Sequence, residues 1–192
     1  MAKKAIHDFF YFGVTPKSEH HKSSHTIKVE LEEAVVEKDL VITDKVAEQI
    51  YRARCKDCNL NFDNMKPQFE KFKQYCSKKC INKKIVINDH QLSLNTAKFF
   101  ADFISKPTIF GLPRISQLNL RKNLLRDPGV IELSKCLSKT KYLVSLDLAS
   151  NEITPKGIKA LSQALSENES LASLNLETLD GFQRNRLSTL GG

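Results

Sequence analysis

The sequence predicts an α/β solenoid, in which strand–turn–helix units stack side by side behind an N-terminal helical cap. Two observations support this fold class. Segments that begin at Ile115, Leu143 and Leu171 align with one another at an offset of 28 residues. Two stripes of apolar residues at helical spacing precede these segments and predict a helical hairpin over residues 44–80. The chain has 192 residues, of which 41% are apolar, and this is enough to build one such domain.

The repeated positions have the spacing expected of a strand followed by a helix. Each unit begins with the pattern L-x-x-L-x-L, or a close variant, which places apolar residues on one face of a short strand. An asparagine that can satisfy backbone groups follows, and then a glycine that allows tight entry into a helix. The first two units match at Leu118 and Leu146, Leu120 and Leu148, Asn123 and Asn151, Gly129 and Gly157, Leu133 and Leu161, and Leu137 and Leu165.

This pattern resembles the leucine-rich repeats of the ribonuclease-inhibitor type, over about Ile85 to Gly192. The resemblance implies a right-handed arc of stacked units, with parallel strands on the concave side and helices on the convex side. It also implies a role in binding other proteins. Asn123 and Asn151 are accordingly expected to be structural rather than catalytic.

Residues 1–25 are predicted to form an extended N-terminal arm. The apolar run from Phe9 to Val14 follows Asp8 and is too short for a signal peptide. We expect the four consecutive aromatic residues of the arm to bind a partner, because a short arm cannot bury them on its own. They are Phe9, Phe10, Tyr11 and Phe12.

Residues 26–84 are predicted to form an N-terminal segment followed by a helical-hairpin cap. Asp44 is expected to cap the first helix of the hairpin, and Pro67 lies near the first turn of the second. Such a hairpin would cover the open apolar edge of the first repeat. The helix that carries Tyr51 and Cys55 resembles the corresponding helix in ribonuclease-inhibitor-like proteins of centrosomes and ciliary axonemes.

The clustered cysteines of this segment leave two alternatives open. The C-x2-C and C-x3-C pairs resemble treble-clef fingers, and four thiolates suit one zinc ion. The same residues also fit the two helical stripes, and no glycine, which a tight knuckle usually needs, occurs between Gly13 and Gly111. A cap without metal or other cofactor is therefore the first hypothesis, and zinc is the alternative. The candidate ligands are Cys55, Cys58, Cys76 and Cys80.

Residues 85–192 are predicted to form the repeats. They comprise a degenerate first unit at 85–110, full units at about 111–138 and 139–166, and an incomplete third unit at 167–192. Counting back 28 residues places His90 where a leucine is expected. The same offset aligns Ile87, Leu92 and Asn95 with Ile115, Leu120 and Asn123.

In the third unit the pattern resumes six residues late, because Asn185, Leu187 and Gly191 have the spacing of Asn151, Ile153 and Gly157. This delay predicts a loop insertion that is exposed near one rim and available for a contact. We also expect the apolar edge of the last unit to lack its helix. Either these residues are part of a longer repeat protein, or another chain covers that edge.

The side chains between the core leucines should line the concave face and contact a partner. Their mixed charges suit a protein better than a phosphate track. The chain carries a formal charge of +8, and residues 61–84 contain seven lysines but only two acidic residues. That segment has no arginine, the residue that usually makes bidentate contacts with bases and phosphates, so a nucleic-acid partner is disfavoured. The predicted concave residues are Gln117, Asn119, Arg121, Ser145, Asp147, Ala149, Ser173, Asn175 and Glu177.

Together these features predict a non-enzymatic protein–protein interaction scaffold, since the sequence contains no P-loop, dinucleotide-binding glycine pattern or Gly-x-Ser-x-Gly elbow. No apolar run approaches the roughly 20 residues of a membrane span, and five cysteines without a signal peptide indicate a reducing compartment. We expect a structural subunit of a large cytoskeletal or ciliary (axonemal) assembly in the cytoplasm, whose partners are proteins rather than a membrane or a small-molecule substrate. The ciliary part rests on the resemblance alone. The alternatives are a zinc-containing nuclear or regulatory adaptor and a regulator of a small GTPase.

Overall fold

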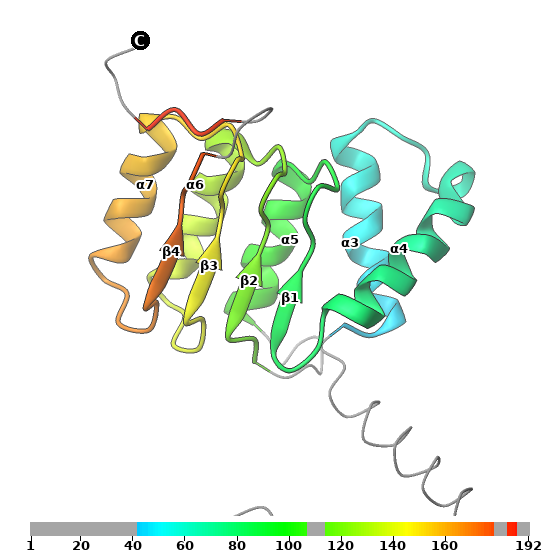
Figure 1. Cartoon of the computed structure of the whole chain (residues 1–192), viewed down its shortest axis with the longest axis horizontal. Helices are drawn as coiled ribbons and strands as arrows, with labels where there is room; N and C mark the ends of the chain where they lie inside the picture. Colours follow the sequence, from blue (N-terminus) through cyan, green and yellow to red (C-terminus); the bar gives the residue numbers. More distant parts are fainter. Residues whose placement is uncertain (1–41, 107–113, 179–183, 188–192) are drawn as a thin grey trace, which may run out of the picture. The chain divides into compact units, whose positions relative to one another are not determined.

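The computed structural model describes residues 42–106, 114–178 and 184–187, and it shows strands that alternate with helices after an initial helical hairpin (Figure 1). The aromatic arm, with Phe9, Phe10, Tyr11 and Phe12, lies outside the described residues. The elements are α3 (Asp44–Asp57), the 3₁₀ helix η2 (Phe62–Met65), α4 (Lys66–Lys79), β1 (Lys84–Val86), α5 (Leu94–Ser105), β2 (Gln117–Asn119), α6 (Arg126–Leu137), β3 (Ser145–Asp147), α7 (Pro155–Leu165) and β4 (Ser173–Asn175).

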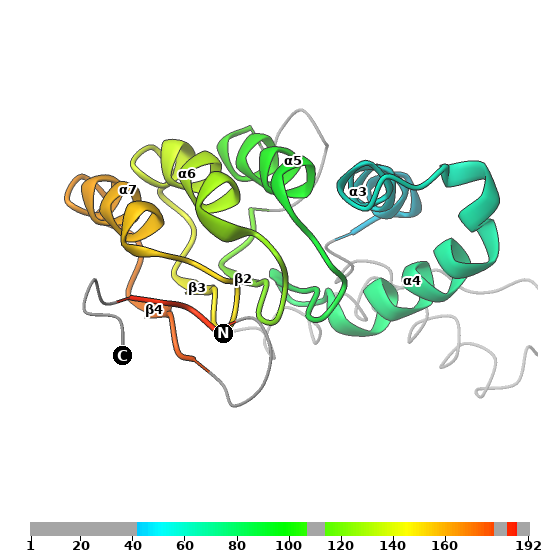
Figure 2. The same ribbon diagram turned by 90° about the horizontal axis from the view of Figure 1, so that it is seen from above.

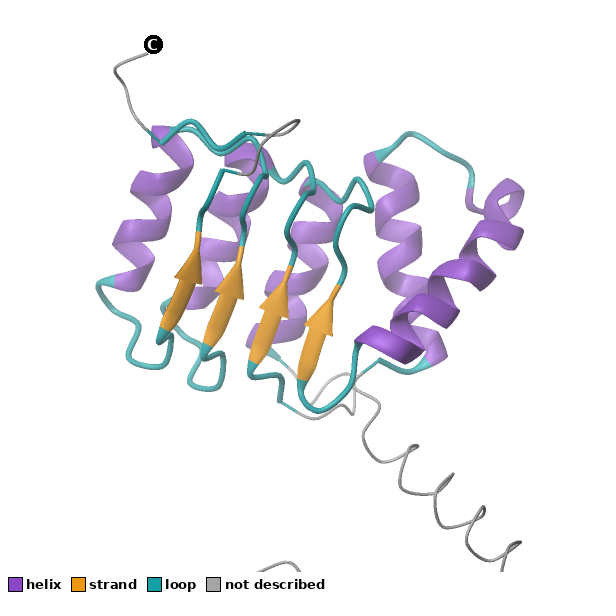
Figure 3. Ribbon diagram, viewed as in Figure 1, coloured by secondary structure: helices purple, strands orange, loops and turns teal. Residues whose placement is uncertain are grey.

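The four strands form one parallel sheet in the order β1-β2-β3-β4, so each strand pairs with the next one along the chain. Figure 2 shows α5, α6 and α7 in a layer on one side of this sheet, and Figure 3 shows the regular alternation of strand and helix. We call the opposite side of the sheet the concave face. Leu118, Leu146 and Leu174 lie opposite one another in the register, as the repeat alignment predicted. The predicted α/β solenoid is thus confirmed.

Buried asparagine side chains connect each unit to the next. The main-chain N–H groups of His90 and Leu92 donate to Oδ1 of Asn123, at 3.0 and 3.1 Å. Nδ2 of Asn123 donates in turn to the carbonyl oxygens of Ile87 and Leu120, both at 2.8 Å. One side chain therefore satisfies backbone groups of two adjacent units, where the chain leaves the strands and no ladder partner is available.

The same arrangement recurs in the later units. Oδ1 of Asn185 accepts from the N–H groups of Asn151 and Ile153, at 2.8 and 3.1 Å, and its Nδ2 donates to carbonyl oxygens of two adjacent units. Nδ2 of Asn151 donates to the carbonyl oxygen of Leu120 at 3.0 Å. We call Asn123, Asn151 and Asn185 the asparagine ladder. The position of Asn185 supports the six-residue delay inferred for the third unit, although residues 179–183 and Gly191 lie outside the described residues.

The alignment of the first unit at an offset of 28 residues is wrong. Lys84 pairs with Gln117 and Ile85 with Leu118, which is an offset of 33 positions (84 to 117). The extra length follows the first helix, because β2 begins 12 positions after α5 ends (105 to 117), whereas β3 begins only 8 positions after α6 ends (137 to 145). His90 consequently occupies the ladder position that asparagine holds in later units, and not a leucine position.

The predicted hairpin over residues 44–80 corresponds to α3, η2 and α4. α3 packs against α5 and α4 packs against β1, so α3 continues the helix layer while α4 lies at the edge of the strand layer (Figure 2). The N-cap of α3 is Thr43, whose hydroxyl accepts from the N–H of Val46, and not Asp44 as predicted. Asp44 instead lies in the first turn of α3, where its negative charge interacts favourably with the positive end of the helix dipole.

Replacing Asn123 by alanine should lower the free energy of unfolding by about 2–4 kcal/mol, because it leaves several buried backbone groups without partners. Asn119 is the matched control, since within the described part of the chain its Oδ1 accepts only from the nearby N–H of Arg121. Asn119→Ala should cost less than about 1 kcal/mol. Urea unfolding followed by circular dichroism measures both. Equal losses in the two variants would contradict the ladder's role.

Candidate protein interaction surface

The junction between the cap and the first repeat depends on Asp57, at the end of α3. Its carboxylate accepts from the N–H groups of Ser93, Asn95 and Thr96, at 2.7 to 3.1 Å, and from the Thr96 hydroxyl at 2.7 Å. These donors are the unpaired groups at the beginning of α5. Asp57 therefore holds the first repeat helix against the cap.

Asp127 performs a similar task between α6 and α7, two steps further along the solenoid. Its carboxylate, in the first turn of α6, accepts from the N–H of Thr154 at 2.8 Å, the Thr154 hydroxyl at 2.6 Å and the N–H of Gly157 at 3.0 Å. A Cβ atom on Gly157 would lie 2.6 Å from Asp127 Oδ1, so only glycine permits this approach. Sequence reasoning missed both aspartates, because they do not occupy equivalent positions in the repeat.

The register of the sheet arranges the concave side chains in rows. The first row is Lys84, Gln117, Ser145 and Ser173, and the second is Val86, Asn119, Asp147 and Asn175. Beyond the strand ends, the same spacing aligns Asn88, Arg121, Ala149 and Glu177 in a third row. The contribution of β1, namely Lys84, Val86 and Asn88, was missed because of the wrong offset for the first unit.

The predicted concave residues differ in their exposure. Ala149 is 0% exposed, so its inclusion among the partner-contacting residues is corrected: a buried methyl group offers a partner no surface. The remaining eight residues are exposed or half-buried, and their contact with a partner stays a prediction. Gln117, Ser173 and Glu177 are the most exposed of them.

Several of these side chains are held in place by their own backbone. Oδ1 of Asn119, Asp147 and Asn175 each accepts from the N–H two residues further on, at 2.9 to 3.1 Å. Such local hydrogen bonds fix the side chain before any partner arrives. The middle row of the concave face is therefore preorganised.

Charges divide across the concave face. Lys84 and Arg121, on the side near the cap, are cationic, whereas Asp147 and Glu177, on the other side, are anionic. Among the described residues, no ion pair connects the two groups. Nε of Arg121 and Oδ1 of the adjacent Asn88 are buried atoms for which the described residues provide no hydrogen-bond partner. Arg121 and Asn88 are themselves half-buried, so only the remaining parts of these side chains can reach a bound protein.

His90 lies where the cap meets this face. Its ring packs against Phe72 and Tyr75 of α4, with centroid distances of 5.3 and 4.7 Å, and Nδ1 lies 2.5 Å from the carbonyl oxygen of Asn88. Burial lowers the pKa of His90 below its ordinary value, and the cation of Arg54 acts in the same direction, against the opposing effect of the Asn88 hydrogen bond. On this side the first repeat meets the helix α4 instead of another repeat. The aromatic side chains of that helix explain why a histidine stands at this position.

The clustered cysteines are parts of the helical hairpin. Cys55 and Cys76 are buried in its core, and Cys58 Sγ lies 3.7 Å from Oε1 of Gln91. The pKa of Cys76 is raised by its hydrogen bond with Cys80 and by burial. No group of three or more His, Cys, Asp or Glu residues in the described part of the chain is arranged to hold a metal ion. The cap without metal stays a prediction, with zinc as its alternative.

Cys136, the remaining cysteine, is buried in α6, and burial raises the pKa of its thiol to about 11. A thiol with this pKa stays protonated at neutral pH and is a poor nucleophile. Cys136 therefore belongs to the apolar core.

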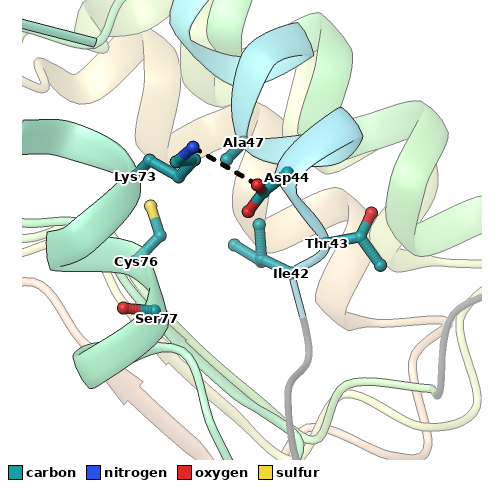
Figure 4. A pocket seen from close by; sticks show the side chains of 7 residues that line it. All are labelled: Ile42, Thr43, Asp44, Ala47, Lys73, Cys76 and Ser77. Carbon is teal, nitrogen blue, oxygen red and sulfur yellow. Dashed lines mark ion pairs between the residues drawn. The ribbon is translucent and has the colours of Figure 1, made fainter. Parts of the chain in front are cut away.

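A pocket of about 370 Å³ opens where α3 begins beside α4 (Figure 4). Its polar rim includes the ion pair between Lys73 Nζ and Asp44 Oδ2, at 3.3 Å. It is lined by Ile42, Thr43, Asp44, Ala47, Lys73, Cys76 and Ser77. The lysine is already paired, and this set contains no nucleophile with a neighbouring base. We therefore take the concave face, and not this pocket, as the candidate site.

One of the comparisons with known proteins agrees with the repeat architecture. A family model described as "Leucine Rich repeat" matches residues 141–162. A solved structure described as "Leiomodin-1 Actin-Binding Site 2 (ABS2)" is similar, with a TM-score of 0.46 and 22% sequence identity. The match covers 53% of this chain and 56% of that chain, so this chain spans little more than half the length of that structure. No curated protein matches significantly. Within the described residues, no helix could cross a membrane.

The unfolding free energy should fall as the pH drops below about 6.5, the ordinary pKa of histidine. His90 has a lowered pKa in the folded state, so the unfolded chain binds the proton more readily and protonation favours unfolding. The loss should continue until the pH reaches the lowered folded-state value. Chemical denaturation of the wild type and of His90→Gln between pH 5 and 8 measures this. A variant with the same pH dependence as the wild type would show that another group is responsible.

The purified chain should contain no stoichiometric metal, and chelators should leave its folding unchanged, since the hairpin is held together by buried apolar contacts of Cys55, Cys76 and their neighbours. Elemental analysis and melting curves with and without EDTA provide the measurement. One zinc ion per chain, together with unfolding on chelation, would establish the zinc alternative instead.

Proposed function

We propose that this chain, a leucine-rich repeat protein by its fold and its matched repeat, is a non-enzymatic scaffold that binds another protein on its concave face. The observation that carries the proposal is the row structure of that face. Polar side chains from four successive strands lie side by side on one open surface, and cations and anions on it remain unpaired within the described residues.

Preorganisation supports binding on this face. The asparagine ladder fixes the strand ends, and local hydrogen bonds fix Asn119, Asp147 and Asn175. A surface whose side chains are already ordered loses little conformational entropy when a partner binds. Binding would therefore require little rearrangement of the scaffold.

The division of charge indicates how a partner would lie. Acidic groups of the partner should face Lys84 and Arg121, near the cap, and basic groups should face Asp147 and Glu177. Opposite charges in this order would favour one orientation and disfavour its reverse, because reversal places like charges together. Arg121 is cationic and half-buried, which makes it the best candidate for a central anchor, as arginine often is in protein interfaces.

The proposed setting is a large cytoskeletal or ciliary (axonemal) assembly in the cytoplasm. The support for the ciliary part is the resemblance of the helix with Tyr51 and Cys55 to those of axonemal and centrosomal repeat proteins. Both residues are buried in α3, where they help to form the cap. The shared feature is thus a way of closing the first repeat.

Arg121→Glu should reduce capture of the concave-face partner at least about tenfold, since it replaces an anchoring cation by a repelling anion. Lys159→Glu, an exposed change on α7, is the matched control and should leave capture unchanged. The measurement is quantitative mass spectrometry of complexes purified with the tagged full chain from ciliated cells. Equal recovery of every partner by both variants would contradict the proposal.

The tagged wild-type chain should remain with detergent-extracted axonemes, because a structural subunit of that assembly does not depend on the membrane for its retention. Immunoblotting of the extracted axonemes and of the soluble fraction measures this. Complete recovery of the tagged chain in the soluble fraction would contradict the ciliary assignment. The scaffold function would still be tested separately by the capture experiment with Arg121→Glu.

A further inference from the structure

The rim at which the strands begin carries a concentration of exposed apolar side chains. Val144 is 46% exposed, Tyr142 40% and Ile81 38%. Only two other large apolar residues of the described part, Leu60 and Leu187, are similarly exposed. Single exposed apolar residues are ordinary, but three of five on one rim form a feature that needs a cause.

Hydrogen bonds place the turns of this rim side by side. The N–H of Ser116 donates to the carbonyl oxygen of Lys83, and the N–H of Val144 donates to that of Ser116, both at 2.8 Å. The guanidinium carbon of Arg114 lies 3.9 Å from the centroid of the Tyr142 ring. The turns before β1, β2 and β3 thus form one continuous surface, which we call the strand-entry rim.

The charges of the strand-entry rim have a single sign. Lys83, Lys84, Arg114 and Lys141 lie in these turns, and the segments 81–84, 114–117 and 141–145 contain no aspartate or glutamate. None of the four cations belongs to an ion pair among the described residues. In the next turn Glu167 and Glu169 line a pocket together with Lys141, so the positive charge of the rim is concentrated at Lys83, Lys84 and Arg114.

We propose that the strand-entry rim binds an acidic protein segment that also presents apolar side chains. An exposed tyrosine stacked beneath an arginine has the composition of an interface hot spot, and the surrounding lysines complement acidic groups. Nucleic acid fits less well, since Val144 and Ile81 offer nothing to a phosphate backbone and the rim has one arginine. Of the rim's cations only Lys84 also belongs to the concave face, so the proposal does not depend on binding at that face.

A peptide selection tests the chemistry directly. A random dodecapeptide display library is selected on the immobilised full chain, after depletion on the double variant Tyr142→Ser, Val144→Ser. Both side chains are exposed, so the variant should fold like the wild type, which a melting curve verifies. The enriched peptides are expected to be rich in aspartate and glutamate interspersed with leucine or aromatic residues.

The affinity of one enriched peptide, measured by fluorescence anisotropy, then tests the residues. Tyr142→Ser, and separately Lys83→Glu with Arg114→Glu, should each weaken binding by about tenfold or more. Leu60→Ser is the matched apolar control and Lys159→Glu the matched charge control, and both should change the affinity less than about twofold. Arg121→Ala should also leave it unchanged, which separates this surface from the concave face.

Three results would overturn the proposal. One is the absence of any enrichment that depends on Tyr142 and Val144. The second is enrichment of basic or uncharged peptides. The third is displacement of the selected peptide by a single-stranded oligonucleotide that binds the chain more tightly than the peptide does. If that oligonucleotide also lost affinity for the variant with Lys83→Glu and Arg114→Glu, the rim would be identified as a nucleic-acid surface.

Discussion

The buried amide side chains of the asparagine ladder are the interaction on which the remaining structure depends. A parallel strand of three residues has few ladder hydrogen bonds, and the chain must leave it in a turn whose backbone groups are out of contact with water. Asn123 supplies an acceptor and a donor at that point, and Asn151 and Asn185 do so in the later units. With the turns fixed, the strand leucines point inward and the intervening side chains line the concave face.

The cap covers the open end of the first repeat and satisfies the backbone groups there. There is no preceding strand beside β1 among the described residues, so α4 packs at that edge and α3 packs against α5. The carboxylate of Asp57 satisfies the beginning of α5, as that of Asp127 satisfies the beginning of α7. His90 packs its ring against α4 at the first ladder position. Because α4 packs against β1, the position of Lys84 on the concave face depends on the cap, which connects the cap to the candidate interaction surface.

The sequence predicted the features that repeat, and it could not predict those that occur once. Equal spacing identified the leucines and the asparagines, including Asn185 after its six-residue delay. A fixed period could not locate the strand of the first unit, since the extra residues lie after α5 and leave no trace in the strand pattern. Asp57 was missed because it has no equivalent position in the repeat and because most of its partners are backbone N–H groups, which have no sequence signature. Ala149 lies in the turn after β3, where side chains no longer alternate between the two faces of the sheet. The alternation used to predict the concave residues therefore could not show that Ala149 is buried.

The central claim is that cap and repeats form one cooperative body that holds the concave face rigid. Native-state hydrogen exchange of the full chain and of Asp57→Ala, followed over a denaturant series, tests it most directly. The account predicts that amides of α3, α4, β1 and α5 open with the same free energy, and that the substitution lowers all of these values together. If the exchange of α5 alone became faster while the cap retained its protection, cap and repeats would be separate units and the account would be contradicted.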